Sequence, residues 1–258
     1  MLTSVVNSLE KEKKGAVITA ADVNKCFDMV FLSDLLLFLF KNKCDIKTIK
    51  VFQILTGYNK LQVQGANRWF EIMNGCGQGG VTAARLTSAG TAEVFERKIV
   101  THPNPMKYRG ESLAVDEFVD DCKMTDYDSR GAKVSGNILT AALDELSLQA
   151  HEDKTVQIVV GHEKYIKDMK DELERNPTYV QGFKVKVVES EKYLGMMVTS
   201  SGVKGMIDKN IEEKRKKSMP ISQESRKLIR DPKLIRIGGL KSACVMLQAK
   251  LIPTILYG

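Results

Sequence analysis

Carboxylates at two places in the sequence are the groups best suited to chemistry. Asp22 ends a short apolar run and opens the segment DVNKCFD, and Asp120 and Asp121 stand together in FVDDCKM. Adjacent carboxylates repel one another, so such a pair needs a nearby cation or exposure to water. Mg²⁺ binds through one or two carboxylates and leaves coordination sites for substrate phosphates. Two such ions can activate a hydroxyl nucleophile and stabilise a leaving oxyanion.

The Asp120–Asp121 pair also fits a plain surface turn, because adjacent aspartates are common at hairpin tips. The surrounding segment is acidic in any case, and its other carboxylates are Asp116, Glu117, Asp126 and Asp128. The dipeptide alone therefore favours the surface turn. The interpretation as a metal site depends on the elements and motifs around it.

Apolar patterning predicts the elements that position these carboxylates. Residues 16–22 (AVITAAD) form an apolar run of strand length that ends on Asp22, as expected for a buried strand. Residues 112–125 predict two short strands with the acidic pair at the tip between them. Upstream, residues 1–12 have the spacing of a helix.

The other elements follow from periodicity and from the positions of glycine and proline. Helices are expected at 34–40 with Ser33 as N-cap, at 46–56, 81–100 and 134–150, and in a charged segment ending near 175. Strands are expected at 155–161, in a hairpin over 60–73 that turns at Gly65, and in a pair at 183–190 and 193–202. This order is no strict βαβ repeat, which predicts an α+β fold with a mixed or antiparallel sheet.

The character of the chain changes after about residue 203. The rest is expected to be helical and basic, with KRKK at 214–217 and an apolar helix near 240–257. A soft domain boundary is therefore predicted there. The most apolar run, at 31–40, is far shorter than the ~20 residues of a membrane-spanning helix. It is expected to be a buried core helix, and no membrane partner is expected.

Bulk composition narrows the class of protein. The chain of 258 residues carries a net charge of +7, which favours polyanionic partners such as nucleic acid and equally fits a solvated basic surface. Its five cysteines contain no CxxC pair, so neither a zinc site nor a disulfide framework is indicated. Reduced thiols and the lack of a signal peptide favour the nucleus or cytoplasm. The three histidines are scattered and are expected at the surface.

Several segments, in order, resemble motifs of the reverse transcriptases of non-LTR retrotransposons, the LINE type. ADVNKCFDMV at 21–30 resembles the first palm motif, which implies Asp22 as a metal ligand and Phe27 as an aromatic gate beneath the sugar that favours dNTPs over rNTPs. FVDD at 118–121 resembles the third motif, which implies Asp120 and Asp121 as the other catalytic metal ligands. The resemblance implies two Mg²⁺ ions, with Mn²⁺ as a substitute.

Three further motifs lie between and after these segments. GCGQGG at 75–80 resembles the second motif, which implies that Gln78 and Gly79 contact the substrate; glycine permits a close backbone approach. HEDKTVQIVVG resembles the fourth motif and implies Lys154 near the triphosphate, as the acid that protonates pyrophosphate. An ordinary exposed lysine is the alternative for Lys154.

The last two matching segments concern the primer. YLG resembles the primer grip and implies this role for Tyr193, Leu194 and Gly195, and residues 241–258 resemble a thumb helix that ends in Tyr-Gly. The resemblance thus implies a palm over 1–203, with a remnant of the fingers–palm junction at 1–14, and a partial helical thumb over 204–258. It implies an RNA-directed DNA polymerase, a nucleotidyltransferase that adds dNTPs to a DNA primer on an RNA template.

Departures from the family pattern leave alternatives open. Ala83-Ala84 stand where Ser-Pro is usual, Val119 replaces a smaller Ala, and the chain begins about twenty residues before Asp22. With little sequence to form fingers, weak or absent polymerase activity is expected, so a catalytically inactive remnant that binds nucleic acid is the second hypothesis. The GCGQGG segment also spells the GxGxxG of dinucleotide-binding folds, but no parallel βαβ unit surrounds it.

Overall fold

The computed structural model describes residues 2–24, 26–57, 60–62, 69–71, 81–113, 115–118, 121–193 and 196–230. Contacts divide the chain into two units, Met1–Glu189 and Ser190–Gly258. The first unit contains the carboxylates and the main sheet. The division falls earlier than the boundary expected near residue 203, and the assignment of the two parts to palm and thumb stays a prediction.

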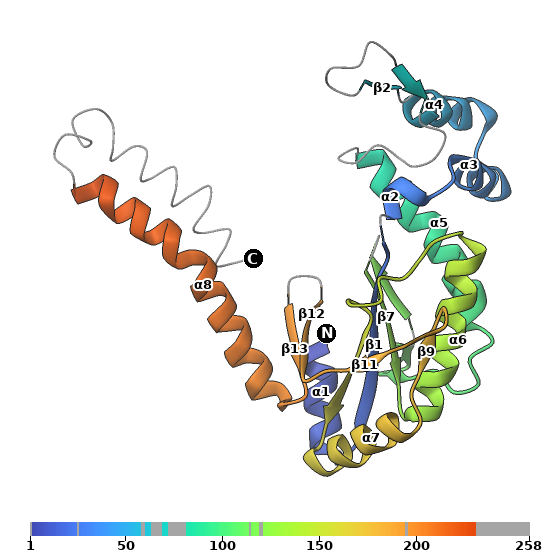
Figure 1. Cartoon of the computed structure of the whole chain (residues 1–258). Coiled ribbons are helices and arrows are strands. Elements are labelled where there is room, and N and C mark those ends of the chain that lie inside the picture. Colours follow the sequence, from blue (N-terminus) through green and yellow to red (C-terminus); the bar gives the residue numbers. More distant parts are fainter. Residues whose placement is uncertain are drawn as a thin grey trace. The chain divides into compact units, whose positions relative to one another are not determined.

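A five-stranded sheet forms the centre of the first unit (Figure 1), in the order β11-β8-β1-β7-β6. The strands are β1 (Gly15–Asp22), β6 (Val115–Phe118), β7 (Asp121–Asp126), β8 (Val156–Gly161) and β11 (Lys186–Val187). All neighbours pair antiparallel except β11, which runs parallel to β8. The predicted α+β fold with a mixed sheet is thereby confirmed.

Helices cover both faces of this sheet, which explains why β1 and β8 are buried along almost their whole length. The helices are α1 (Leu2–Lys11), α6 (Ser129–Glu145) and α7 (Glu163–Arg175). Ala132 of α6 and Met169 of α7 share one apolar cluster with Val17 and Val159. Side chains alternate along a strand, so Val17 points towards α6 and α7, whereas Ile18 and Asp22 point to the opposite face.

The remaining elements of the first unit surround this core. They are α2 (Cys26–Met29), α3 (Leu32–Lys41), α4 (Ile46–Gly57), β2 (Lys60–Gln62), β3 (Trp69–Glu71), α5 (Val81–Ile99), β4 (Lys107–Tyr108), β5 (Glu111–Ser112), β9 (Tyr179–Val180) and β10 (Phe183–Lys184). The expected hairpin over 60–73 is present as β2 paired with β3, while its turn at Gly65 lies outside the described residues. The helices expected at 46–56 and 81–100 are confirmed as α4 and α5.

The second unit begins with a hairpin and continues as a long helix. Its elements are β12 (Ser190–Tyr193), β13 (Met196–Thr199) and α8 (Gly202–Arg230). The apolar helix expected near 240–257 lies outside the described residues. In the part of the chain that is described, no helix has both the length and the hydropathy needed to cross a bilayer.

Three expectations about these elements are wrong. The run at 31–40 is not a buried core helix: only Leu35 and Leu39 of α3 are buried, and Phe40 is 63% exposed. Ser33 is not its N-cap, because α3 begins at Leu32 and Phe31 caps it without a side-chain bond. Residues 183–190 do not form one strand but divide among β10, β11 and β12. Backbone pairing with three different partners decided this division, and the local sequence gave no sign of it.

Helix α6 also differs from its expected bounds: it begins at Ser129, five residues before the expected start at 134, and ends at Glu145. Asp128 caps it by accepting a hydrogen bond of 2.8 Å from the backbone N–H of Gly131. The first two turns contain small and polar residues, SRGAKVSG, so they lack the apolar spacing that marks a helix. The small residues among them, such as Gly131, Ala132 and Ser135, let α6 lie close against a polar group of the sheet.

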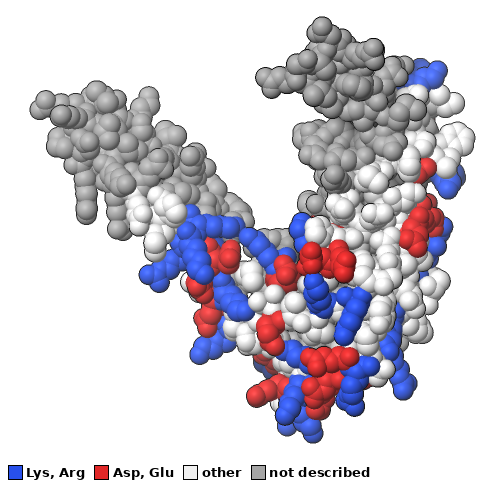
Figure 2. All heavy atoms as spheres, in the orientation of Figure 1, with Lys and Arg blue, Asp and Glu red and all other residues white. Residues whose placement is uncertain are grey.

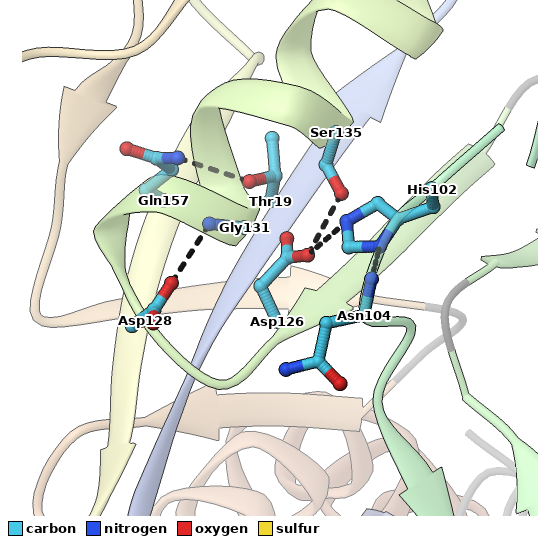
Figure 3. A network of polar contacts seen from close by, with 8 residues as sticks. All are labelled: Thr19, His102, Asn104, Asp126, Asp128, Gly131, Ser135 and Gln157. Atoms are coloured by element: carbon cyan, nitrogen blue, oxygen red, sulfur yellow. Dashed lines mark hydrogen bonds and ion pairs between the residues drawn. The ribbon is translucent and has the colours of Figure 1, made fainter.

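That polar group is Asp126, the last residue of β7 (Figure 3). Its Oδ1 atom lies 3.0 Å from Nε2 of His102 and 3.0 Å from Oγ of Ser135. The N–H of Asn104 donates to Nδ1 of His102, which leaves Nε2 as the ring nitrogen that bonds to the carboxylate. His102 is only 5% exposed, and the expectation that the histidines lie at the surface is wrong for it.

Burial raises the pKa of Asp126 to about 6, against the opposing effects of the Ser135 hydroxyl and of His102. The folded protein therefore holds a proton on this carboxyl at pH values where the unfolded chain has lost it. The resulting stabilisation is complete below about pH 4 and is lost as the pH rises through about 6.

Asp126→Asn removes this titration. Between about pH 5 and pH 7, the unfolding free energy of the native chain is expected to fall by about 1 kcal/mol relative to that of the variant. Urea unfolding followed by circular dichroism measures both. Asp168→Asn, which changes an exposed carboxylate on α7, is the matched control and is expected to keep the native pH dependence. Equal pH dependence of Asp126→Asn and the native chain would contradict the assignment.

Candidate metal-binding site

Two predicted metal ligands meet at the end of the central sheet. Asp22, the last residue of β1, is the register partner of Asp121, the first residue of β7. Residues directly opposite in an antiparallel pair have their side chains on the same face, with Cβ atoms about 4.5–5.5 Å apart. The structure therefore brings these two carboxylates together from positions about a hundred residues apart in the chain.

The two strands hold this register because their other residues are buried. β1 is buried from Gly15 to Ala21, and the residues of β7 beyond Asp121 are buried as well. A slip by one residue would turn each buried side chain to the opposite face. Pairing between β6 and β7 ends at Phe118 and Asp121, and Asp120 lies outside the described residues. The predicted two strands with an acidic tip are confirmed, apart from the tip itself.

A segment on the other side of β1 extends this carboxyl end. Val23 forms an antiparallel bridge with Ala150. The N–H of Asn24 donates to the carbonyl of Gln149 at 2.7 Å, and the N–H of His151 donates to the carbonyl of Asp22 at 2.8 Å. The backbone of Asp22 is thus held by β7 on one side and by residues 149–151 on the other.

The chain then turns back over the carboxylate. The carbonyl of His151 accepts hydrogen bonds from the N–H groups of Lys154 and Thr155 and from the Thr155 hydroxyl. This turn places Nζ of Lys154 at 3.0 Å from Oδ2 of Asp22. The Lys154 side chain is 60% exposed, whereas that of Asp22 is 23% exposed. The resemblance implied Lys154 near the triphosphate, a role that stays a prediction, and the structure places its ammonium against Asp22.

The other predicted site residues are less fully described. Phe27 lies in α2, directly after the carboxyl end of β1, but its side chain is outside the described part. Tyr193 ends β12 in the second unit, again without a described side chain. The residues wholly outside the described part of the chain are Gln78, Gly79, Asp120, Leu194 and Gly195. Their roles stay predictions.

The carboxylates at this end suit a divalent cation. Within the described residues, which leave out Asp120, no cluster of three or more His, Cys, Asp or Glu side chains could hold a metal ion. Asp22 and Asp121 are nevertheless two carboxylates at facing positions, and Mg²⁺ uses one or two carboxylates in proteins. The ammonium of Lys154 already lies where a positive charge offsets their repulsion. The residues present therefore fit a magnesium ion.

Sequence reasoning missed the segment at 149–151 that holds Asp22 from the side. Its residues, Gln149, Ala150 and His151, have no strand pattern, and their pairing depends on the backbone of β1 alone. The nearest signal was the HEDKT match, which marked Lys154 without indicating how the turn reaches Asp22.

Comparisons with known proteins agree with this architecture. A family model described as reverse transcriptase (RNA-dependent DNA polymerase) matches residues 1–198. No curated protein matches the sequence.

Solved telomerase structures are similar in fold. One is an apo telomerase from Candida tropicalis truncated from its C-terminal domain, with a TM-score of 0.51 and 13% identity, covering 77% of this chain and 38% of that one. Another is a telomerase from Candida albicans in complex with a fragment of telomeric RNA, with a TM-score of 0.52 and 11% identity, covering 99% of this chain and 43% of that one. The chain thus spans less than half the length of either telomerase. At such low identity the likeness shows the fold alone, which resembles the palm.

Asp22→Asn tests whether the facing carboxylates repel one another. Without metal, the variant is expected to match or exceed the native chain in unfolding free energy, by at most about 1 kcal/mol, because a cross-strand like-charge pair is relieved and only an exposed ion pair is lost. Thermal unfolding in EDTA and in Mg²⁺ measures this, and the rise in Tm caused by Mg²⁺ is expected to vanish.

Asp168→Asn is again the matched control and is expected to keep the response to Mg²⁺. If Asp22→Asn instead lowered the unfolding free energy in EDTA by more than about 2 kcal/mol, Asp22 would be a structural residue and not a metal ligand.

Proposed function

The chain belongs to the reverse transcriptase family, and on that premise we propose that its first unit is the catalytic palm of an RNA-directed DNA polymerase. The observation that carries the proposal is the register that sets Asp22 opposite Asp121, with Lys154 against Asp22. The motif order supports a non-LTR lineage of the LINE type. RNA template, DNA primer and dNTPs are the partners that this activity requires.

In this proposal Asp22, Asp120 and Asp121 hold two Mg²⁺ ions. When bound, the ions activate the primer 3′-hydroxyl and stabilise the leaving pyrophosphate. The strands fix the carboxylate oxygens in advance, so binding needs little reorganisation. Fixed ligands also set where the triphosphate lies relative to the primer, which is the largest part of what such an enzyme must do.

Lys154 has a separate task in the proposed reaction. Its exposed side chain lies on a turn whose backbone is held by hydrogen bonds to His151. It can therefore leave Asp22 and reach a phosphate oxygen without any change in the backbone. There its ammonium neutralises charge on the phosphate and donates a proton to the departing pyrophosphate.

The other predicted residues would bind the substrates. Phe27 would select the deoxyribose, Gln78 and Gly79 would contact the substrate, and residues 193–195 would hold the primer.

Incorporation of dNTPs on a primed RNA template tests the proposal. The native chain with Mg²⁺ is expected to extend the primer, and Asp120→Asn is expected to lower the rate by at least about a hundredfold because a metal ligand is lost. Asp168→Asn serves as the control with unchanged rate. Extension that survives in Asp120→Asn would contradict catalysis at this site.

A second candidate function, nucleic-acid binding without catalysis, is favoured by α8. This helix contains KRKK at 214–217, and the ammonium of Lys192 lowers the pKa of Lys217 beside it. Glu212 and Glu213 neutralise part of this charge through pairs with Lys216 and Lys192. Lys and Arg are interspersed with acids on the visible face of the described residues (Figure 2). Crowded cations of this kind are stabilised by the phosphates of a polyanion.

Binding through these lysines predicts a strong dependence on salt and little dependence on sequence. Lys217→Gln is expected to weaken binding to single-stranded RNA and to reduce the slope of log K against log salt by about 1. Fluorescence anisotropy over a range of salt measures this, with Lys164→Gln, an exposed lysine of α7, as the control. An unchanged slope in Lys217→Gln would exclude this part of α8 from the contact.

A further inference from the structure

The tip of the β9–β10 hairpin has an unusual residue for its backbone conformation. Val180 pairs with Phe183, so Gln181 and Gly182 form a two-residue turn, with φ values of +44° and +87°. Such a turn favours Asn followed by Gly. Gln in the left-handed region costs about 1 kcal/mol or more. Gln181 is longer than the Asn that this turn favours, which indicates that the length of its side chain serves a contact elsewhere.

The side chain of Gln181 is fully engaged with the segment that precedes Lys154. Its Oε1 accepts from the N–H of Ala150 at 2.8 Å, and its Nε2 donates to Oδ1 of Asp144 at 2.7 Å and to the carbonyl of Leu148 at 2.9 Å. Its own N–H donates to the Thr140 hydroxyl at 2.8 Å. One residue thereby joins the hairpin to α6 and to the chain that leaves α6.

The bond to Ala150 has the most direct bearing on the carboxylate site. Ala150 is the bridge partner of Val23, and its neighbours Gln149 and His151 make the two backbone bonds to β1. In such a bridge the N–H of the central residue points away from the partner strand. The outward N–H of Ala150 donates to Oε1 of Gln181, which occupies the position that a further strand would otherwise fill. Residues 149–151 are therefore held from both sides.

We propose that Gln181 is a positioning residue for the metal-binding end of β1: it clamps residues 148–150, and through them it sets the backbone of Asp22 and the turn that presents Lys154. The inference rests on the proposed function for its catalytic consequence, while the clamp itself is independent of it. Gln181 is remote from the metal ligands in sequence and bonds to neither Asp22 nor Asp121, the two that the structure describes, so it acts through residues 148–151.

Gln181→Asn separates the clamp from the hairpin. Asn is better suited than Gln to the left-handed turn, so the hairpin and the global unfolding midpoint are expected to be kept, whereas its shorter side chain cannot reach Ala150. Hydrogen exchange followed by mass spectrometry is expected to show amides of residues 149–155 exchanging about tenfold faster or more, with α7 unchanged. Unchanged exchange at 149–155 would overturn the clamp.

Introducing a negative charge at Gln181, followed by a compensating change, removes the ambiguity of a simple loss. Gln181→Glu keeps an acceptor for Ala150 but turns a donor into a carboxylate oxygen facing Asp144, and faster exchange at 149–155 is expected. Asp144→Asn in the same chain restores a donor to that contact, but not to the Leu148 carbonyl that Nε2 also bonds, and is therefore expected to recover part of the protection. Failure of the double variant to recover would argue against the direct Gln181–Asp144 contact on which the clamp depends.

The catalytic consequence has its own readouts. In Gln181→Asn the affinity for Mn²⁺ is expected to fall several-fold, as measured by electron paramagnetic resonance of the free ion. The kcat for dNTP incorporation is expected to fall about tenfold, while the KM for dNTP stays nearly unchanged. Faster exchange with both quantities unchanged would overturn the positioning role. If the native chain neither binds Mn²⁺ nor extends a primer, the proposed function fails and the catalytic consequence with it, and exchange at 149–155 alone decides the clamp.

Discussion

The register that sets Asp22 opposite Asp121 is the constraint around which the first unit is organised. Their register places two negative charges on the same face at the end of two neighbouring strands, an arrangement that destabilises a sheet unless a cation offsets it. It persists because the strands below it are buried and cannot slip. The ammonium of Lys154, delivered by a separate turn, supplies one positive charge. A divalent ion with substrate phosphates would supply more.

The opposite end of β7 has a buried carboxylate that serves a different purpose. Asp126 is the register partner of Val17 and is held by His102 and Ser135 beneath α6. A shift of β7 by one residue would break both contacts and turn Asp126 to the other face of the sheet. The buried cluster therefore helps to fix the register that brings Asp121 opposite Asp22. The cost of burying Asp126 appears as its raised pKa.

The sequence was informative where local pattern and tertiary structure coincide. The apolar run of β1, the paired strands around the acidic tip and helices α4 and α5 were predicted because local sequence marks them, through apolar runs of suitable length and through the glycines and prolines that bound them. The start of α6 was missed because its first turns cover a polar group, and His102 was misplaced because burial of a histidine depends on a partner 24 residues away. The clamp by Gln181 joins three segments, and no local pattern marks it.

A crystal of the native chain soaked in Mn²⁺ gives the most direct test of a metal site at the end of β1 and β7. Anomalous density is expected within about 2.2 Å of carboxylate oxygens of both Asp22 and Asp121, with the Lys154 ammonium displaced from Asp22. An Mn²⁺ soak that leaves the Lys154–Asp22 pair intact, with no anomalous density at these carboxylates, would contradict the claim that the end of β1 and β7 is a metal site.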